Sequence, residues 1–135
     1  TVFDKRSKLY WQKCANGQTN DATCSSAAVG INWQNSLSYC NGLSLAGKQW
    51  RLPNFTELVS LIDTSQAAAP YINTSIFIGH PTGATKLFQS STSVPAGVSY
   101  PGRVDFAVPE GVTADDKSPA TNGGYQYLAR CVSGP

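Results

Sequence analysis

Apolar residues recur at helical spacing in two segments of the chain. In the first segment, Trp33, Leu37 and Cys40 fall on one face at positions i, i+4 and i+7. Asn32 precedes this segment as a helix N-cap, and Gly42 stands where a helix would end. The pattern predicts a helix whose inner face carries Cys40 to the core.

The second helical segment starts directly after a proline. Pro53 disfavours helical geometry at Leu52, and Asn54 and Glu57 have the spacing of a capping box. Periodicity then predicts a helix over roughly residues 55–63. Its apolar face consists of Phe55, Leu58, Leu61 and Ile62. Trp50 and Leu52 are expected to anchor the start of this helix in the core.

Four segments of the chain have the character of strands. Residues 1–12 are expected to be extended, with Leu9, Tyr10 and Trp11 buried. Strands are also predicted at 87–92, at 103–108 and at 125–132, where the last two alternate between two faces. Turn-forming residues predict mostly irregular chain at 67–83 and a long polar loop at 109–124. The predicted fold is α+β, with two early helices, a mainly antiparallel late sheet and terminal strands that can pair.

Composition places the chain among secreted proteins. Its 135 residues suit one domain, residues 1–135, that buries around two thirds of its unfolded surface. Charged residues make up 13%, about half the usual fraction, and a formal charge of +2 is too small to indicate a nucleic-acid binder. No apolar run approaches the roughly 20 residues that cross a bilayer. Without a signal segment or an initiator methionine, we expect the chain to be part of a longer protein.

The four cysteines favour disulfides over a metal site. No C-x-x-C pair occurs, and only one histidine, His80, is present to complete a zinc site. Sequence alone allows three pairings. We favour Cys14 with Cys24, closing a polar loop, and Cys40 with Cys131, joining the first helix to the last strand. Two disulfides indicate an oxidising compartment outside the cell.

Motifs along nearly the whole chain resemble one bacterial family. They are Trp11, Trp33, Tyr39-Cys40, Trp50-Arg51-Leu52-Pro53, Glu57-Leu58, Ser90-Ser91-Thr92, Val104-Asp105-Phe106 and Arg130-Cys131-Val132. Together they are similar to the C-terminal domain family of the Legionella collagen-like adhesin. The resemblance implies a C-type-lectin-like fold whose termini are joined by a helix-to-last-strand disulfide. It also implies a bacterial surface module that follows a collagen stalk, forms a trimer and binds sulfated polysaccharides such as glycosaminoglycans.

The chain departs from the patterns of this family and of related proteins. Phe88-Gln89 stands where the family commonly has Trp, and the aromatic ring is expected to keep the packing. Formylglycine-generating enzymes share a related fold and the Trp50–Pro53 motif, but their activity needs a redox or copper-binding cysteine pair in a much longer domain. Lectin-type calcium motifs are absent. We therefore expect no metal, no cofactor and no enzymatic activity.

The densest basic group is Lys5, Arg6 and Lys8, with Lys13 nearby. Such a group can give charge-assisted hydrogen bonds to sulfates, although lysine on a strand edge also blocks aggregation. A trimer would repeat the group around one axis and add avidity for a polymer. The predicted glycan-binding set is completed by four residues that are isolated in sequence, Lys48, Lys86, Arg103 and Lys117. They would belong to the set if they converge on a loop-rich face.

Structural explanations are preferred for the other polar candidates. Arg51 and Arg130 are expected to make buried hydrogen bonds, with Glu57, Asp63 or Asp105 as partners. His80 is interpreted as a turn residue, because no second histidine or thiol accompanies it. Solvent exposure is the default for Glu110, Asp115 and Asp116.

Aromatic residues can offer platforms for sugar rings, and the candidates are Tyr71, Phe77, Tyr100, Tyr125 and Tyr127. Core packing explains about half of these residues equally well.

The sequence thus predicts an extracellular, non-enzymatic adhesin domain that binds sulfated or anionic glycans of a host surface or matrix, without calcium and as a homotrimer. Neither nucleic acid nor membrane insertion is expected. One alternative is a protein-binding display module that uses polar and aromatic residues of the late loops, including 109–124. The other alternative is a formylglycine-generating type of enzyme, which would need a free cysteine.

Overall fold

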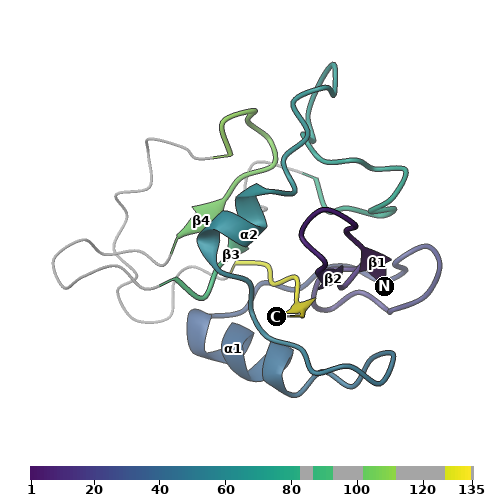
Figure 1. Ribbon diagram of the computed structural model, residues 1–135, viewed down its shortest axis with the longest axis vertical. Coiled ribbons are helices and arrows are strands. Elements are labelled where there is room, and N and C mark those ends of the chain that lie inside the picture. Colours follow the sequence, from purple (N-terminus) through teal and green to yellow (C-terminus); the bar gives the residue numbers. More distant parts are fainter. Residues whose placement is uncertain (83–86, 93–101, 112–126, 135) are drawn as a thin grey trace, which may run out of the picture.

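The computed structural model of the protein describes residues 1–82, 87–92, 102–111 and 127–134. It contains two helices and two small antiparallel sheets, which confirms the predicted α+β class. Helix α2 (Phe55–Val59) lies above helix α1 (Trp33–Asn41) in Figure 1, and the chain that connects them runs out to one side and back. Within the described ranges, no helix has the length and apolar character to cross a membrane.

Helix α1 (Trp33–Asn41) has the predicted bounds and caps. The Asn32 side chain accepts a hydrogen bond from the Asn35 N–H, and Gly42 forms the C-cap. Cys40 is fully buried, while Trp33 and Leu37 are partly buried against the same cluster. The predicted inner face is therefore confirmed.

Helix α2 (Phe55–Val59) is shorter than predicted. Its capping box forms as expected between Asn54 and Glu57. The helix ends early because the Ser60 hydroxyl donates to the Glu57 carbonyl and the next N–H groups bond three residues back instead of four. Asp63 N–H then bonds to the Tyr71 carbonyl, which ties the chain to another segment.

The first sheet joins the two termini. Strand β1 (Val2–Phe3) pairs with β2 (Tyr10–Trp11), and β2 pairs with β5 (Val132–Ser133), so the order is β1-β2-β5. The marked N and C ends accordingly lie near one another in Figure 1. Residues 1–12 are thus a hairpin and not one extended segment, because a tight turn separates the two strands.

The second sheet pairs β3 (Phe88–Gln89) with β4 (Arg103–Val104). Both strands are shorter than predicted at 87–92 and 103–108. After β4 the chain turns, because the Asp105 carboxylate accepts from the Ala107 N–H and the Asp105 N–H bonds to the Gly111 carbonyl. Residues 60–82 contain turns and bends without helix or strand, as predicted for 67–82.

The C-terminal segment divides the core into two clusters. Leu128 and Val132 pack in a cluster with Trp11 and Phe88, whereas Ala129 and Cys131 pack with Trp50 on the α1 side. The predicted alternation at 125–132 therefore holds over 128–132. However, both faces are buried here, and ladder pairing begins only at Val132, after isolated bridges at Tyr127 and Leu128.

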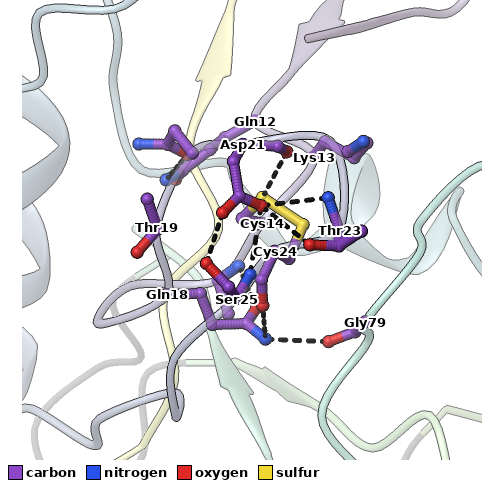
Figure 2. The surroundings of a disulfide bond; sticks show 12 residues. Gln12, Lys13, Cys14, Gln18, Thr19, Asp21, Thr23, Cys24, Ser25 and Gly79 are labelled. Atoms are coloured by element: carbon purple, nitrogen blue, oxygen red, sulfur yellow. Dashed lines mark hydrogen bonds between the residues drawn. A yellow bond between two sulfur atoms is a disulfide. The ribbon is translucent and has the colours of Figure 1, made fainter.

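Both predicted disulfides are present, and no free cysteine remains. Cys14–Cys24 closes a short loop in which the Asp21 carboxylate accepts from Thr23 and Ser25, while Gln18 Nε2 bonds to the Gly79 carbonyl (Figure 2). Cys40–Cys131 spans 91 residues and joins α1 to the C-terminal segment. The hydrogen bond from Gln18 to Gly79 holds the polar loop against the rest of the domain.

The two disulfides should differ in what they contribute to stability. Loop entropy assigns about 3 kcal/mol to a loop of 10 residues and about 4 to 5 kcal/mol to one of 91. Replacing Cys40 and Cys131 by alanine should therefore lower the free energy of unfolding in urea more than the Cys14/Cys24 double replacement does. An equal or smaller loss for the Cys40/Cys131 variant would contradict this account.

Candidate functional site

The turn between β1 and β2 presents three basic side chains, those of Lys5, Arg6 and Lys8. Inside the turn, the Asp4 carboxylate accepts from the Arg6 N–H at 2.9 Å and from the Ser7 hydroxyl at 2.5 Å. The Ser7 hydrogen bond holds the pKa of Asp4 below its usual value. Lys8 has a φ of 63°, which closes the turn before Leu9 enters the core. We call these three residues the basic turn.

The side chains of the basic turn are exposed and not neutralised by ion pairs. All three residues are solvent-exposed. Among the described residues, the ion pair within 4 Å is that of Arg51 with Glu57, in another part of the fold. The one acid inside the turn, Asp4, is satisfied mainly by its own loop. The basic turn therefore has cationic groups available for an anionic ligand.

Two further predicted cations are held against the protein. Lys13 Nζ donates to the Ala22 carbonyl at 2.5 Å, inside the loop closed by Cys14–Cys24. Lys48 Nζ lies 3.5 Å from the centroid of the Tyr10 ring. These contacts fix both charges, so neither joins the basic turn as a freely placed group.

Of the remaining predicted cations, only Arg103 lies within the described residues. Arg103 lies in β4, is buried, and places its guanidinium 4.4 Å from the centroid of the Tyr127 ring. Lys86 and Lys117 lie outside the described residues. The sequence pattern thus located the basic turn itself, whereas convergence of the four isolated cations on one loop-rich face stays a prediction.

A groove runs beside the basic turn. It is lined by residues 2–7 and Trp11, by residues 60–63, and by Asn73, Ile76 and Phe77, and has a volume of about 540 Å³. The turn indeed lies next to the chain that follows α2 in Figure 1. The volume of the groove falls in the usual range for ligand sites. No sequence signal pointed to this groove, because its residues come from three separate segments.

Arg51 and Glu57 have the structural role that their motif predicted. Arg51 donates two hydrogen bonds to the Glu57 carboxylate, at 2.7 and 2.8 Å, and the same carboxylate accepts from the Asn54 N–H. Burial opposes ionisation, but these bonds hold the pKa of Glu57 below its usual value. The pair joins the bridge at Arg51–Val132 to the start of α2.

Arg130 contacts the His80 ring in the core, among aromatic side chains. The sequence did not predict this contact. Arg130 is fully buried, but instead of an acid it approaches His80, with Nη1 3.4 Å from Nδ1. Its guanidinium also lies over the rings of Phe77 and Phe88. The interpretation of His80 as a turn residue is incomplete, since the ring is buried between Phe88 and Phe106. Burial lowers the pKa of His80 to about 3, and the Arg130 charge adds to this effect.

The predicted aromatic platforms differ in how deeply they are buried. Phe77 is buried in the core, and Phe88, whose ring was expected to keep the packing, is buried in the same cluster. Tyr71 and Tyr127 are partly buried. Tyr100 and Tyr125, like Asp115 and Asp116, lie outside the described residues, whereas Glu110 is exposed as expected.

Fold and site together define a small α+β domain, held by two disulfides, that presents a cationic turn beside a groove. The chain belongs to the Lcl C-terminal domain family, whose model matches residues 1–133. It is therefore, at the family level, a domain of the collagen-like adhesin type. Family and disulfides are consistent with a location at the bacterial surface or outside the cell. No curated protein and no solved structure matches the chain, so the lectin-like assignment stays a prediction.

The buried His80 should make folding sensitive to mild acid. Because its folded-state pKa is about 3 and the ordinary value is 6.5, the unfolded chain takes up a proton that the folded chain does not. The free energy of unfolding should fall as the pH drops below about 6.5, by about 1.4 kcal/mol per unit. Urea denaturation between pH 6.5 and 5 measures this slope.

A variant isolates the histidine in this measurement. His80 is the one histidine of the chain, and side-chain carboxylates titrate mostly below this pH window. Substitution His80→Phe keeps an aromatic ring in place and should flatten the slope. If the wild-type protein is equally stable at pH 6.5 and 5, the placement of His80 described above is wrong.

Proposed function

We propose that this domain binds sulfated or otherwise anionic polysaccharides through the basic turn. The observation that carries the proposal is the exposure of Lys5, Arg6 and Lys8 on one short turn, with no acid within ion-pair distance in the described part of the chain. Ammonium and guanidinium groups bind sulfate and carboxylate oxygens by charge-assisted hydrogen bonds. No calcium ion is required for such contacts.

One basic turn would bind a single sulfated segment weakly. Exposed charge pairs contribute about 0.2 to 1 kcal/mol each, and salt screens them. A polysaccharide repeats its anionic groups, so several copies of the turn would bind one chain with avidity. We therefore include a homotrimer in the proposal, in keeping with the collagen-like adhesin family. The host surface or matrix would supply the glycan.

The proposed role is adhesion without catalysis. All four cysteines are engaged in disulfides, which leaves none of them as the free thiol that formylglycine-generating chemistry would need. The alternative of a protein-binding display module depends on the late loop at 109–124, and residues 112–124 of that loop lie outside the described residues. The exposed basic turn is the observation among the described residues that supports the glycan ligand.

Heparin affinity tests the proposal directly. The folded domain should be retained at low salt and elute as sodium chloride rises. Replacing Lys5, Arg6 and Lys8 together by glutamine should raise the dissociation constant for heparin about tenfold or more, because three exposed charge contacts are lost. Calcium chelation should change nothing.

A matched control removes one cation elsewhere. Lys48→Gln deletes a charge that lies against the Tyr10 ring, and it should weaken heparin binding less than Lys5→Gln or Arg6→Gln. Circular dichroism checks that each variant is folded. A folded domain that passes unretained at low salt, or a triple variant that binds as well as the wild type, would refute the proposal.

A further inference from the structure

The groove beside the basic turn joins cationic and apolar surfaces. Lys5 and Arg6 line it, and so do Phe3 and Ile76, whose side chains keep 44% and 45% of their surface exposed. Few large apolar residues are exposed to this degree in the described structure, and two of them, Phe3 and Ile76, border the same groove. Burying them would be favourable for a ligand that carries an apolar group as well as a negative charge.

Asn73 adds a hydrogen-bond donor to the groove. Its Oδ1 accepts from the N–H groups of Ser75 and Ile76, at 3.1 and 3.3 Å, which fixes the orientation of the amide. The Nδ2 group makes no hydrogen bond to any described residue. Asn73 also lines the groove, so this amide can donate to a carbonyl oxygen of a ligand.

The two carboxylates of the groove are satisfied by their own turns. Asp4 is held by Arg6 N–H and Ser7, and Asp63 accepts from Ser65 and Gln66. Because these hydrogen bonds lower the pKa of both groups, both acids stay charged and partly offset the two cations that line the groove. Beside these acids, the groove offers cationic groups, an amide donor and apolar walls.

We infer that this groove binds one N-acetylated, anionic sugar residue of the polysaccharide. The sulfate or carboxylate of that residue pairs with Lys5 and Arg6. Its acetamide carbonyl accepts from Asn73 Nδ2, and the acetyl methyl packs against Phe3 and Ile76. The inference rests on the proposed function, and it specifies which member of the anionic glycans is preferred.

An N-sulfated sugar suits the same groove less well. Its nitrogen carries a second anionic group in place of the acetyl group, and burying that charge against Phe3 and Ile76 would cost desolvation energy without a paired cation. The groove thereby predicts a preference that charge alone would not give. Binding by charge alone would instead favour the more highly sulfated polymer.

A pair of ligands with equal charge tests the inference. Chondroitin sulfate is de-N-acetylated and then re-acylated with either acetyl or formyl groups, so that the two products differ by one methyl per N-acylated sugar. The acetyl form should bind the folded domain about fourfold more tightly, since a buried methyl contributes about 0.8 kcal/mol. Calorimetry at constant salt measures both constants.

Two pairs of variants complete the test. Ile76→Thr should abolish the preference for acetyl, whereas Ile78→Thr, at a side chain of similar exposure outside the groove lining, should keep it. Asn73→Ser retains an acceptor for the turn but lacks the amide donor, and it should weaken both acyl forms. Lys5→Gln should weaken both forms without changing their ratio.

The outcomes separate this inference from the proposed function. Equal, salt-dependent binding of the acetyl and formyl forms would overturn the groove while leaving the basic turn as the glycan site. The groove would also be overturned if Ile76→Thr and Ile78→Thr changed the acetyl preference to the same extent. Absence of binding to either polymer, together with absence of heparin retention at low salt, would overturn both proposals.

Discussion

The disulfide between Cys40 and Cys131 holds the C-terminal segment against helix α1 while that segment lies between the two clusters of the core. Sheet hydrogen bonds alone would fix it poorly, because β5 pairs with β2 over two residues. Buried side chains add to the disulfide: Gln12 Oε1 accepts from Cys131 N–H, and Asn16 Oδ1 accepts from Ala129 N–H. A covalent bond thus replaces an extensive sheet as the organising constraint.

This constraint positions the basic turn. Because β2 is held between β1 and β5, the hairpin that carries Lys5, Arg6 and Lys8 has a fixed base, while its tip remains in solvent. The Trp50–Leu58 motif stabilises the scaffold from the other side, through the Arg51–Glu57 pair and the capped start of α2. The motif that identifies the family is therefore separate from the residues proposed to bind glycan.

Local signals located both helices and their caps, because these depend on residues close in sequence, although α2 ends four residues earlier than predicted. Both favoured disulfides formed, out of the three pairings that four cysteines allow. The strands were predicted too long, since alternation at 103–108 reflects burial and the Asp105 turn decides where pairing stops. Arg130 was expected to meet an acid, but aromatic rings and His80 surround it instead. The basic turn was visible in the sequence, whereas the groove required three segments to meet in space.

Chemical-shift mapping with a short sulfated oligosaccharide tests the central claim most directly. Amide signals of the ¹⁵N-labelled domain are followed during titration at low salt, so that every part of the chain reports at once. The account predicts that the largest shifts fall on residues 4–8, with smaller ones at 73–77 across the groove, and that added salt reverses them. Shifts concentrated in the 109–124 loop, with residues 4–8 unchanged, would contradict it.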